Sequence, residues 1–189
     1  MRTRNVALTA TILSACVLAA CSASHPVAST AGGAPHAAST AAAPAEHYHA
    51  TLALVGQPAV TADGKDIQVN VAVTNDGTAT FGSTTEPHNV NLGAHAANAA
   101  GKWVINNLAR GHLPQIAPGT TRQASILLPV DKVLGDSAVL LPVQEDVAWF
   151  DKWGTKPLVV GPFKACGNPS VGKVCNASGA PLPVATASR

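Results

Sequence analysis

Apolar and polar residues alternate most clearly between Ile67 and Thr74, where every odd-numbered position is isoleucine or valine and most even-numbered positions are polar. Successive side chains of a β-strand point to opposite faces, so this alternation predicts a strand with one face in a core. Asn75, Asp76 and Gly77 follow it. This sequence is typical of a turn, because asparagine and glycine accept positive φ.

Short apolar runs of the same kind recur about every ten residues between Glu46 and Phe163, with turn residues between them. No segment there has a convincing helical period, and Asp131–Gly135 is at most one helical turn with Asp131 as its cap. The expected strands are 49–55, 67–74, 88–95, 103–105, 122–128, 138–143 and 158–163.

Many short strands without a long helix are typical of an antiparallel β-sandwich of the immunoglobulin-like class. We therefore predict an all-β fold, a single immunoglobulin-like antiparallel β-sandwich over residues 46–165. A disordered N-terminal tether and a loose C-terminal tail are expected to flank it. The disulfide that joins the two sheets of antibody domains is not expected, because Cys166 and Cys175 both follow the last predicted strand.

The segment Val143–Trp153 has the densest group of large rings and charges in the chain. Strand alternation places Trp149 and Phe150 on opposite faces. We expect Trp149 to fill the core, and Phe150 and Trp153 to close its end.

A ligand-binding interpretation of the same segment stays open. Flat aromatic side chains cover the apolar C–H faces of sugars, and neighbouring carboxylates accept hydrogen bonds from sugar hydroxyls. Trp153 would be the platform, and Glu145, Asp146 and Asp151 would be the acceptors. A protein partner is the other ligand considered. The adjacent Glu145 and Asp146 point to opposite faces of a strand, which does not suit paired-carboxylate hydrolysis of glycosides.

Four segments together resemble one family of modules. They are Asn89–Leu92, Leu108–Pro114, Ile116–Thr120 and Val143–Phe150, the last with the sequence V-Q-E-D-V-A-W-F. The resemblance, which covers about residues 86–160, is to immunoglobulin-like β-sandwich modules appended to bacterial glycosyltransferases and methyltransferases of surface-polysaccharide pathways.

The resemblance has limits that bear on function. Ala94-His95-Ala96 stands where an aromatic pair is expected. The 189 residues contain no catalytic domain of those enzymes, and the modules have no catalytic residue to carry over.

The N-terminal residues predict export. Arg2 and Arg4 precede an apolar run from Val6 to Ala20, as in a secretory signal peptide, here residues 1–20. Leu18-Ala19-Ala20-Cys21 resembles the bacterial lipobox, which implies cleavage before Cys21 and its modification with fatty acyl chains such as palmitate. Several acyl chains on one cysteine give stable membrane attachment. Ser22, rather than aspartate, implies the outer membrane, facing the periplasm, if the cell is Gram-negative.

Residues 21–45 predict a flexible linker, because they are rich in alanine, serine, threonine and proline and contain no charged side chain. Residues 166–189 predict a disulfide loop and a loose tail. Cys166 and Cys175 are an even pair in an oxidising compartment, separated by turn residues, so we expect them to form a disulfide. Metal binding by the two thiols is the weaker alternative.

Charge argues against some partners. The chain has 12 basic and 10 acidic side chains, and loss of Arg2 and Arg4 with the signal leaves 10 of each. A neutral chain without a basic run gives no electrostatic case for binding nucleic acid. No sequence motif of a hydrolase or phosphate-binding loop is present, so we expect no enzymatic activity and no cofactor.

His47 and His49 form an H-x-H pair at the edge of the predicted domain. On a strand both imidazoles would face the same side, where they could share Zn²⁺ or Cu²⁺. The prediction from the sequence is therefore an envelope lipoprotein with a non-catalytic binding or structural domain. The first alternative is a carbohydrate-binding accessory of surface polysaccharide, and the weaker one is a periplasmic metal-binding protein.

Overall fold

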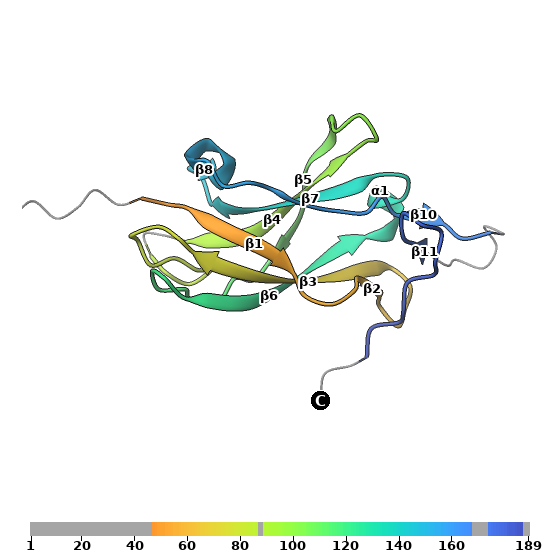
Figure 1. Cartoon of the computed structure of the whole chain (residues 1–189), viewed down its shortest axis with the longest axis horizontal. Coiled ribbons are helices and arrows are strands. Elements are labelled where there is room, and N and C mark those ends of the chain that lie inside the picture. The colour runs from red at the N-terminus through yellow and green to blue at the C-terminus, as the bar shows by residue number, and fades with distance from the viewer. Residues whose placement is uncertain (1–46, 87–88, 168–173, 187–189) are drawn as a thin grey trace, which may run out of the picture. The chain divides into compact units, whose positions relative to one another are not determined.

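The computed structural model describes residues 47–86, 89–167 and 174–186. Two antiparallel sheets pack face to face (Figure 1), which confirms the predicted all-β sandwich. The elements are β1 (Ala50–Leu54), β2 (Ala59–Val60), β3 (Asp66–Asn75), β4 (Val90–Ala97), β5 (Trp103–Gly111), β6 (Thr121–Pro129), α1 (Val130–Val133), β7 (Ser137–Gln144), β8 (Ala148–Trp149), a 3-10 turn η1 (Phe150–Trp153), β9 (Leu158–Val160), β10 (Lys164–Ala165) and β11 (Val174–Cys175).

One sheet is built around β3, which pairs with β1 and β2 on one side and with β6 on the other. The other sheet has the order β5-β4-β7, and β8 and β9 both pair with the far side of β7. The small pair β10–β11 lies beyond β9 in the chain. Among the described residues, no helix is both long and apolar enough to cross a membrane.

The alternation in β3 positions the core as predicted. Ile67, Val69, Val71 and Val73 are all fully buried, and the residues between them are half-buried. Val90 and Leu92 of β4 face them from the other sheet and are also fully buried. Burial of such side chains contributes about 1.5–3 kcal/mol each, so these strands hold the two sheets together.

Two local predictions need correction. The turn after β3 forms without positive φ at Asn75, Asp76 or Gly77. Asn75 works through its side chain, which is buried and bonds three backbone groups. The helical turn is α1, which begins at Val130, and no side chain caps it, so Asp131 is not its cap.

The described part of the C-terminal segment is attached to the sandwich. The amide of Leu182 donates to the carbonyl of Val174, and Val60 exchanges backbone hydrogen bonds with Pro183 and Ala185. Within the tail that the sequence predicted to be loose, residues 183–185 therefore lie beside Val60 of β2, and residues 176–180 form a turn after Cys175. The predicted signal peptide, Cys21 and the predicted linker fall outside the described residues.

Candidate functional site

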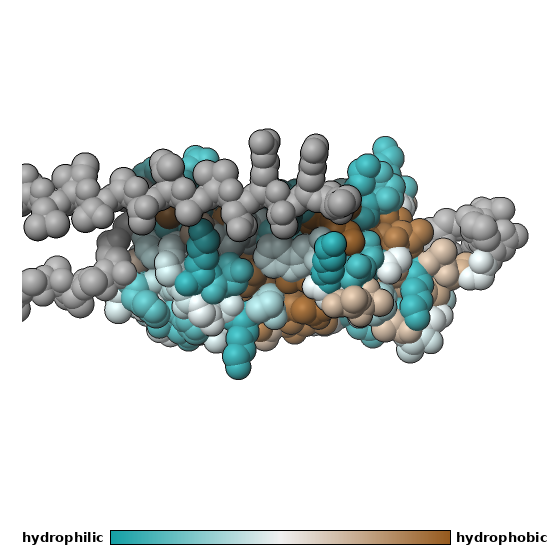
Figure 2. All heavy atoms as spheres, turned by 90° about the horizontal axis from the view of Figure 1, so that it is seen from above, coloured by the Kyte–Doolittle hydropathy of each residue, from teal (hydrophilic) through white to brown (hydrophobic). Residues whose placement is uncertain are grey.

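The outer face of the β5-β4-β7 sheet is covered by aromatic side chains. Gly93 of β4 pairs with Leu141 of β7, and His95 pairs with Val139, so these four residues share the face turned away from the core. All four are nevertheless buried. Strand β7 is therefore buried on both faces, which explains its nearly continuous apolar sequence. Figure 2 shows hydrophobic and hydrophilic residues side by side on the part of the surface that is visible from above.

His95 lies between two tryptophans. Its ring centroid is 3.8 Å from that of Trp103, with the planes 12° apart, and 3.9 Å from that of Trp149, with the planes tilted by 39°. The imidazole is only 2% exposed. Gly93 makes this arrangement possible, because a Cβ atom there would lie 2.5 Å from the Trp149 ring. We call Trp103, His95 and Trp149 the aromatic stack.

The hydrogen bonds of His95 define its protonation. Its Nδ1 accepts the backbone N–H of Asn107 at 3.3 Å, so in the neutral ring the proton is on Nε2. This Nε2 is buried without a hydrogen-bond partner among the described residues. Burial lowers the pKa of His95 below its ordinary value, the positive charge of Arg110 lowers it further, and Asp151 opposes both effects. The stack therefore contains a neutral imidazole at pH 7.

A polar network borders the stack. The guanidinium carbon of Arg110 lies 4.7 Å from the centre of the Trp149 ring, and its Nε donates to Oε1 of Glu145 at 3.0 Å. The same oxygen accepts from Nδ2 of Asn91 at 2.7 Å. Ser83 in turn donates to Oδ1 of Asn91. These bonds fix Glu145 and Arg110 at the end of the sheet where β8 begins.

The two tryptophans of the stack differ in how much of each ring is exposed to solvent. Trp149 has His95 against it and Arg110 over its ring, and it covers the outer face of β7. Trp103 stacks on His95 and is still 40% exposed, beside Val104, which is 48% exposed. Asn106 and Asn107, further along the same strand, are exposed amides. An exposed indole with amide and charged groups nearby has the chemistry of a sugar-binding surface.

The residues predicted to bind a ligand are placed differently by the structure. Trp153 is half-buried and packs 5.2 Å, between ring centroids, from both Tyr48 and Phe150. Glu145 joins the network beside Trp149, whereas Asp146 and Asp151 are exposed in the segment that follows. Of the predicted residues, only Glu145 has a described hydrogen bond to a residue that contacts the aromatic stack. That residue is Arg110, which lies over the Trp149 ring.

The prediction that Trp149 fills the core was wrong. Phe150 takes that place: it is fully buried and meets Phe81 edge-on at 5.3 Å between centroids. Strand alternation separated the two rings correctly but assigned the wrong one to the core. Trp103 was not singled out from the sequence, because its contact with His95 crosses from β5 to β4 past a register shift in their pairing.

The histidine pair faces one side, as its spacing predicted. The rings of His47 and His49 are stacked with centroids 6.0 Å apart, and Nδ1 of His49 lies 3.7 Å from Oδ2 of Asp76. Within the described ranges, no group of three or more histidine, cysteine or carboxylate side chains is assembled for a metal ion. Among these residues, the histidine pair therefore has no assembled third ligand.

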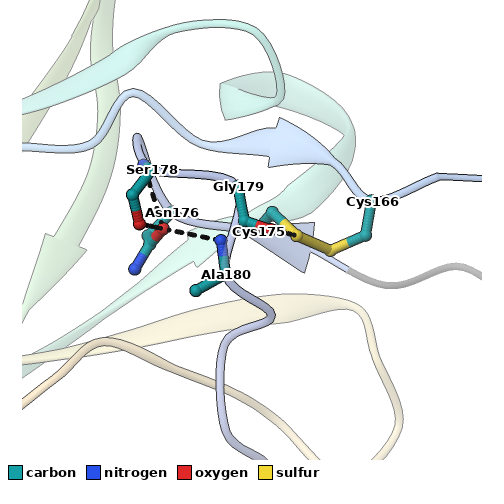
Figure 3. Close-up of a disulfide and its surroundings, with 6 residues drawn as sticks. All are labelled: Cys166, Cys175, Asn176, Ser178, Gly179 and Ala180. Carbon is teal, nitrogen blue, oxygen red and sulfur yellow. Dashed lines mark hydrogen bonds between the residues drawn. A yellow bond between two sulfur atoms is a disulfide. The ribbon is translucent and has the colours of Figure 1, made fainter.

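Cys166 and Cys175 form the predicted disulfide (Figure 3). It joins the end of β10 to β11, whose two residues are buried. The turn after it is held by Oδ1 of Asn176, which accepts from Ser178 and from the backbone N–H of Ala180. The disulfide therefore anchors the start of the segment that lies along β2.

Comparison of the chain with models of known protein families and with curated proteins finds no match. The resemblance to modules of polysaccharide enzymes thus remains a prediction from four short segments.

Proposed function

We propose that this chain is a non-catalytic binding module of the bacterial cell envelope, and that it binds sugar rings of a surface polysaccharide on the aromatic stack. The observation that carries the proposal is Trp103, an indole with one face on a buried imidazole and 40% of its surface exposed. Its support on both β4 and β5 holds the ring in place before a ligand arrives, which lowers the entropy lost on binding.

The chemistry of the surrounding surface supports a sugar rather than an apolar partner. A pyranose ring offers C–H groups to the indole, and its hydroxyls need donors and acceptors around the ring. Exposed Asn106 and Asn107 lie on the same strand, and the Arg110–Glu145 pair lies beyond Trp149. A protein partner or a purely structural role in the envelope is the alternative.

Location at the envelope rests on the sequence. The lipobox-like residues ending at Cys21 support a lipid anchor, and the disulfide between Cys166 and Cys175 supports an oxidising compartment. A linker of residues 21–45 would hold the module away from the membrane. Replacing Cys21 by alanine should move the protein from the membrane to the soluble fraction, whereas Cys16→Ala should not, because Cys16 leaves with the signal peptide.

Sugar binding is tested with polysaccharide purified from the envelope of the bacterium that encodes the chain. We expect saturable binding by the purified protein in a microcalorimeter, and a loss of about tenfold in affinity for Trp103→Ala, consistent with removal of one aromatic contact. Val104→Ala is the matched control, since Val104 is the next residue of β5 and is similarly exposed. No binding, or equal binding by Trp103→Ala, would contradict the proposal.

A further inference from the structure

The core-facing side of β1 is uncovered at one end. Ala50, Leu52 and Leu54 pair with the buried Asn75, Val73 and Val71 of β3, so all three side chains lie on the side of the core. Their exposure nevertheless rises along the strand, from 2% at Ala50 to 41% at Leu54. A leucine on the inner face of a sandwich is ordinarily covered by the opposite sheet. At Leu54 that cover is missing, whereas Leu52 still packs against the core.

The same three residues point their backbone groups away from the sheet. The amide of Asp76 donates to the carbonyl of His49, and the amide of Val55 donates to the carbonyl of Asn70. Hydrogen-bonded pairs alternate along an antiparallel ladder, so Thr51 and Ala53 also bond β3. The amides and carbonyls of Leu52 and Leu54 therefore face outward. The outward amide of Ala50 is already occupied, because it donates to Oγ1 of Thr155 at 3.0 Å.

Two hollows lie one after the other along this free edge, between β1 and β9. One, of about 400 Å³, is bordered by Leu52, Pro157 and Leu158, with Lys156 at its rim. The other, of about 380 Å³, is bordered by Leu54, Val159 and Phe163. Strand β9 thus forms the opposite wall of both hollows. A free edge with hollows at successive positions is the arrangement that binds an added strand, through backbone bonds and alternate side chains.

Strand β1 also lacks the features that keep sheet edges from pairing. From Thr51 to Leu54 it has no charged residue, no proline and no bulge. The edge of β6 is approached by β5, because a Cβ on Gly111 would lie 2.5 Å from the carbonyl oxygen of Ser125. The edge of β2 is covered by Pro183 and Ala185. Among these described edges, β1 is the one whose outward groups, at Leu52 and Leu54, have no described hydrogen bond to a neighbouring segment, although β9 runs close to it.

We propose that an extended peptide segment of another protein adds to the outer edge of β1. It runs antiparallel to β1 and bonds the amides and carbonyls of Leu52 and Leu54. Its inward side chains are apolar and fill the two hollows. Its last residue carries a carboxylate that faces Lys156. This site is separate from the aromatic stack and does not depend on sugar binding there.

The direction and the charge of the peptide follow from the surroundings. An antiparallel strand ends near Ala50, where Thr155 closes the edge and Lys156 is exposed. Lys156 has no ion pair among the described residues, whose ion pairs are His49–Asp76, Arg110–Glu145 and Lys132–Asp131. A second copy of this chain would fit less well, because neither β1 nor β9 carries a carboxylate to meet Lys156.

The probe is a nine-residue synthetic peptide that alternates threonine with leucine and ends in a free carboxylate, together with the same peptide ending in an amide. Binding to the full chain carrying Cys21→Ala is measured by fluorescence anisotropy. We expect the amidated peptide to bind about two- to fivefold more weakly, the effect of one exposed ion pair. Lys156→Glu should abolish or reverse that difference. At saturation, hydrogen exchange at the amides of Leu52 and Leu54 should slow by at least fivefold.

Leu54→Pro removes one outward amide without removing a bond to β3, and we expect it to weaken binding by at least about fivefold. Leu127→Pro on β6 is the matched control and should bind as the parent does. If Leu54→Pro does not fold, the exchange at Leu52 and Leu54 in the parent protein decides. The proposal is overturned if the peptide does not bind or protects other strands instead. It is also overturned if Leu52 and Leu54 are protected without peptide, by a second copy or by the chain's own N-terminal segment.

Discussion

At the scale of single residues, Gly93 decides whether the aromatic stack can form. A Cβ at this position would lie 2.5 Å from Cη2 and Cζ3 of Trp149, and Arg110 would be the next neighbour at 3.1 Å. The φ of Gly93 is not in the left-handed region, so the requirement for glycine is steric. Trp149 could not keep its place over β4 beside a larger residue.

Replacing Gly93 by alanine should therefore destabilise the protein by about 1–3 kcal/mol, the usual effect of forcing an extra methyl group into a packed site. In a Trp149→Ala background the same replacement should cost little, because the clashing ring is gone. Urea unfolding of the four proteins of this double-mutant cycle measures the coupling. Equal costs in both backgrounds would show that Gly93 is needed for some other reason.

The second prediction at this scale concerns His95 and pH. Burial lowers the pKa of the folded state below the ordinary 6.5 that holds after unfolding. As pH falls below about 6.5, the unfolded chain therefore binds a proton that the folded chain refuses, and stability decreases by up to about 1.4 kcal/mol per pH unit. His95→Phe keeps a ring in the stack and removes the titrating group.

The measurement is the free energy of unfolding between pH 7.5 and 5. The decrease on acidification should be smaller in His95→Phe than in the parent, whatever the absolute stabilities of the two proteins. Val104→Ala, which removes an exposed side chain without a titrating group, provides the control and should keep the slope of the parent. An unchanged slope in His95→Phe would mean that the imidazole charges as easily in the folded protein as in the unfolded one.

At the scale of elements, the side chain of Asn75 joins two loops at one end of the sandwich. Its Nδ2 donates to the carbonyls of Ala79 and Ile116, at 2.8 and 2.9 Å, and its Oδ1 accepts the amide of Gly77. The residue is fully buried, so water cannot replace these bonds. Asn75 thereby connects the end of β3 to the segment that precedes β6.

Asn75→Ala leaves the carbonyl of Ala79 and the amide of Gly77 without a described partner, and the carbonyl of Ile116 keeps only the amide of Phe81. We expect a loss of about 3 kcal/mol. Asn106→Ala removes an exposed amide of β5 and should change stability by less than about 0.5 kcal/mol. Thermal unfolding followed by circular dichroism compares the two variants. If both lose the same small amount, the hydrogen bonds of Asn75 do not stabilise the loops.

The strands of this fold could be predicted from the sequence where one face is buried in the core and the other is exposed. The valines of β3 alternate because one side is buried and the other is not, and β6 follows the same rule, whereas β4 is buried on both faces from Leu92 onward. That rule fails at β7 and β8, where the outer face is also covered. With only one buried face assumed for each strand, the sequence pattern predicted Trp149 in the core. The structure places the Trp149 ring on the outer face instead, where Gly93 leaves room for it.

The candidate site was less predictable, because its contacts are long-range. Trp103 and His95 meet across two strands whose register shifts between Ala94 and Ala97, and spacing along the chain does not reveal such a contact. The carboxylates near Trp153 were recognisable as charged groups beside aromatic ones, yet the fold turns Trp153 toward Tyr48. The tryptophans and carboxylates of the sequence led to the hypothesis of a sugar-binding surface. The sequence did not reveal that Trp103, rather than Trp153, is the exposed tryptophan.

At the scale of the whole molecule, the disulfide holds the C-terminal segment on the sandwich. It fixes β11 to β10, and from β11 the chain continues to the residues that bond β2. Leu182 packs against the core and borders the hollow beside Leu54. Loss of the disulfide would thus loosen one wall of the proposed peptide site as well as the tail.

We expect reduction of the disulfide to release residues 174–186 while the two sheets stay folded. Closing a loop between residues nine apart is worth about 2.5 kcal/mol in the chain-entropy model, and this value applies to the segment rather than to the sandwich. Hydrogen exchange at the amides of Leu182 and Ala185 should accelerate by roughly 70-fold in Cys166→Ser/Cys175→Ser, the factor that corresponds to this free energy. The amide of Val71, in the middle of β3, is the internal control and should exchange as in the parent protein. Equal acceleration at Val71 would show that the disulfide stabilises the whole sandwich, because the segment and the sheets then open together.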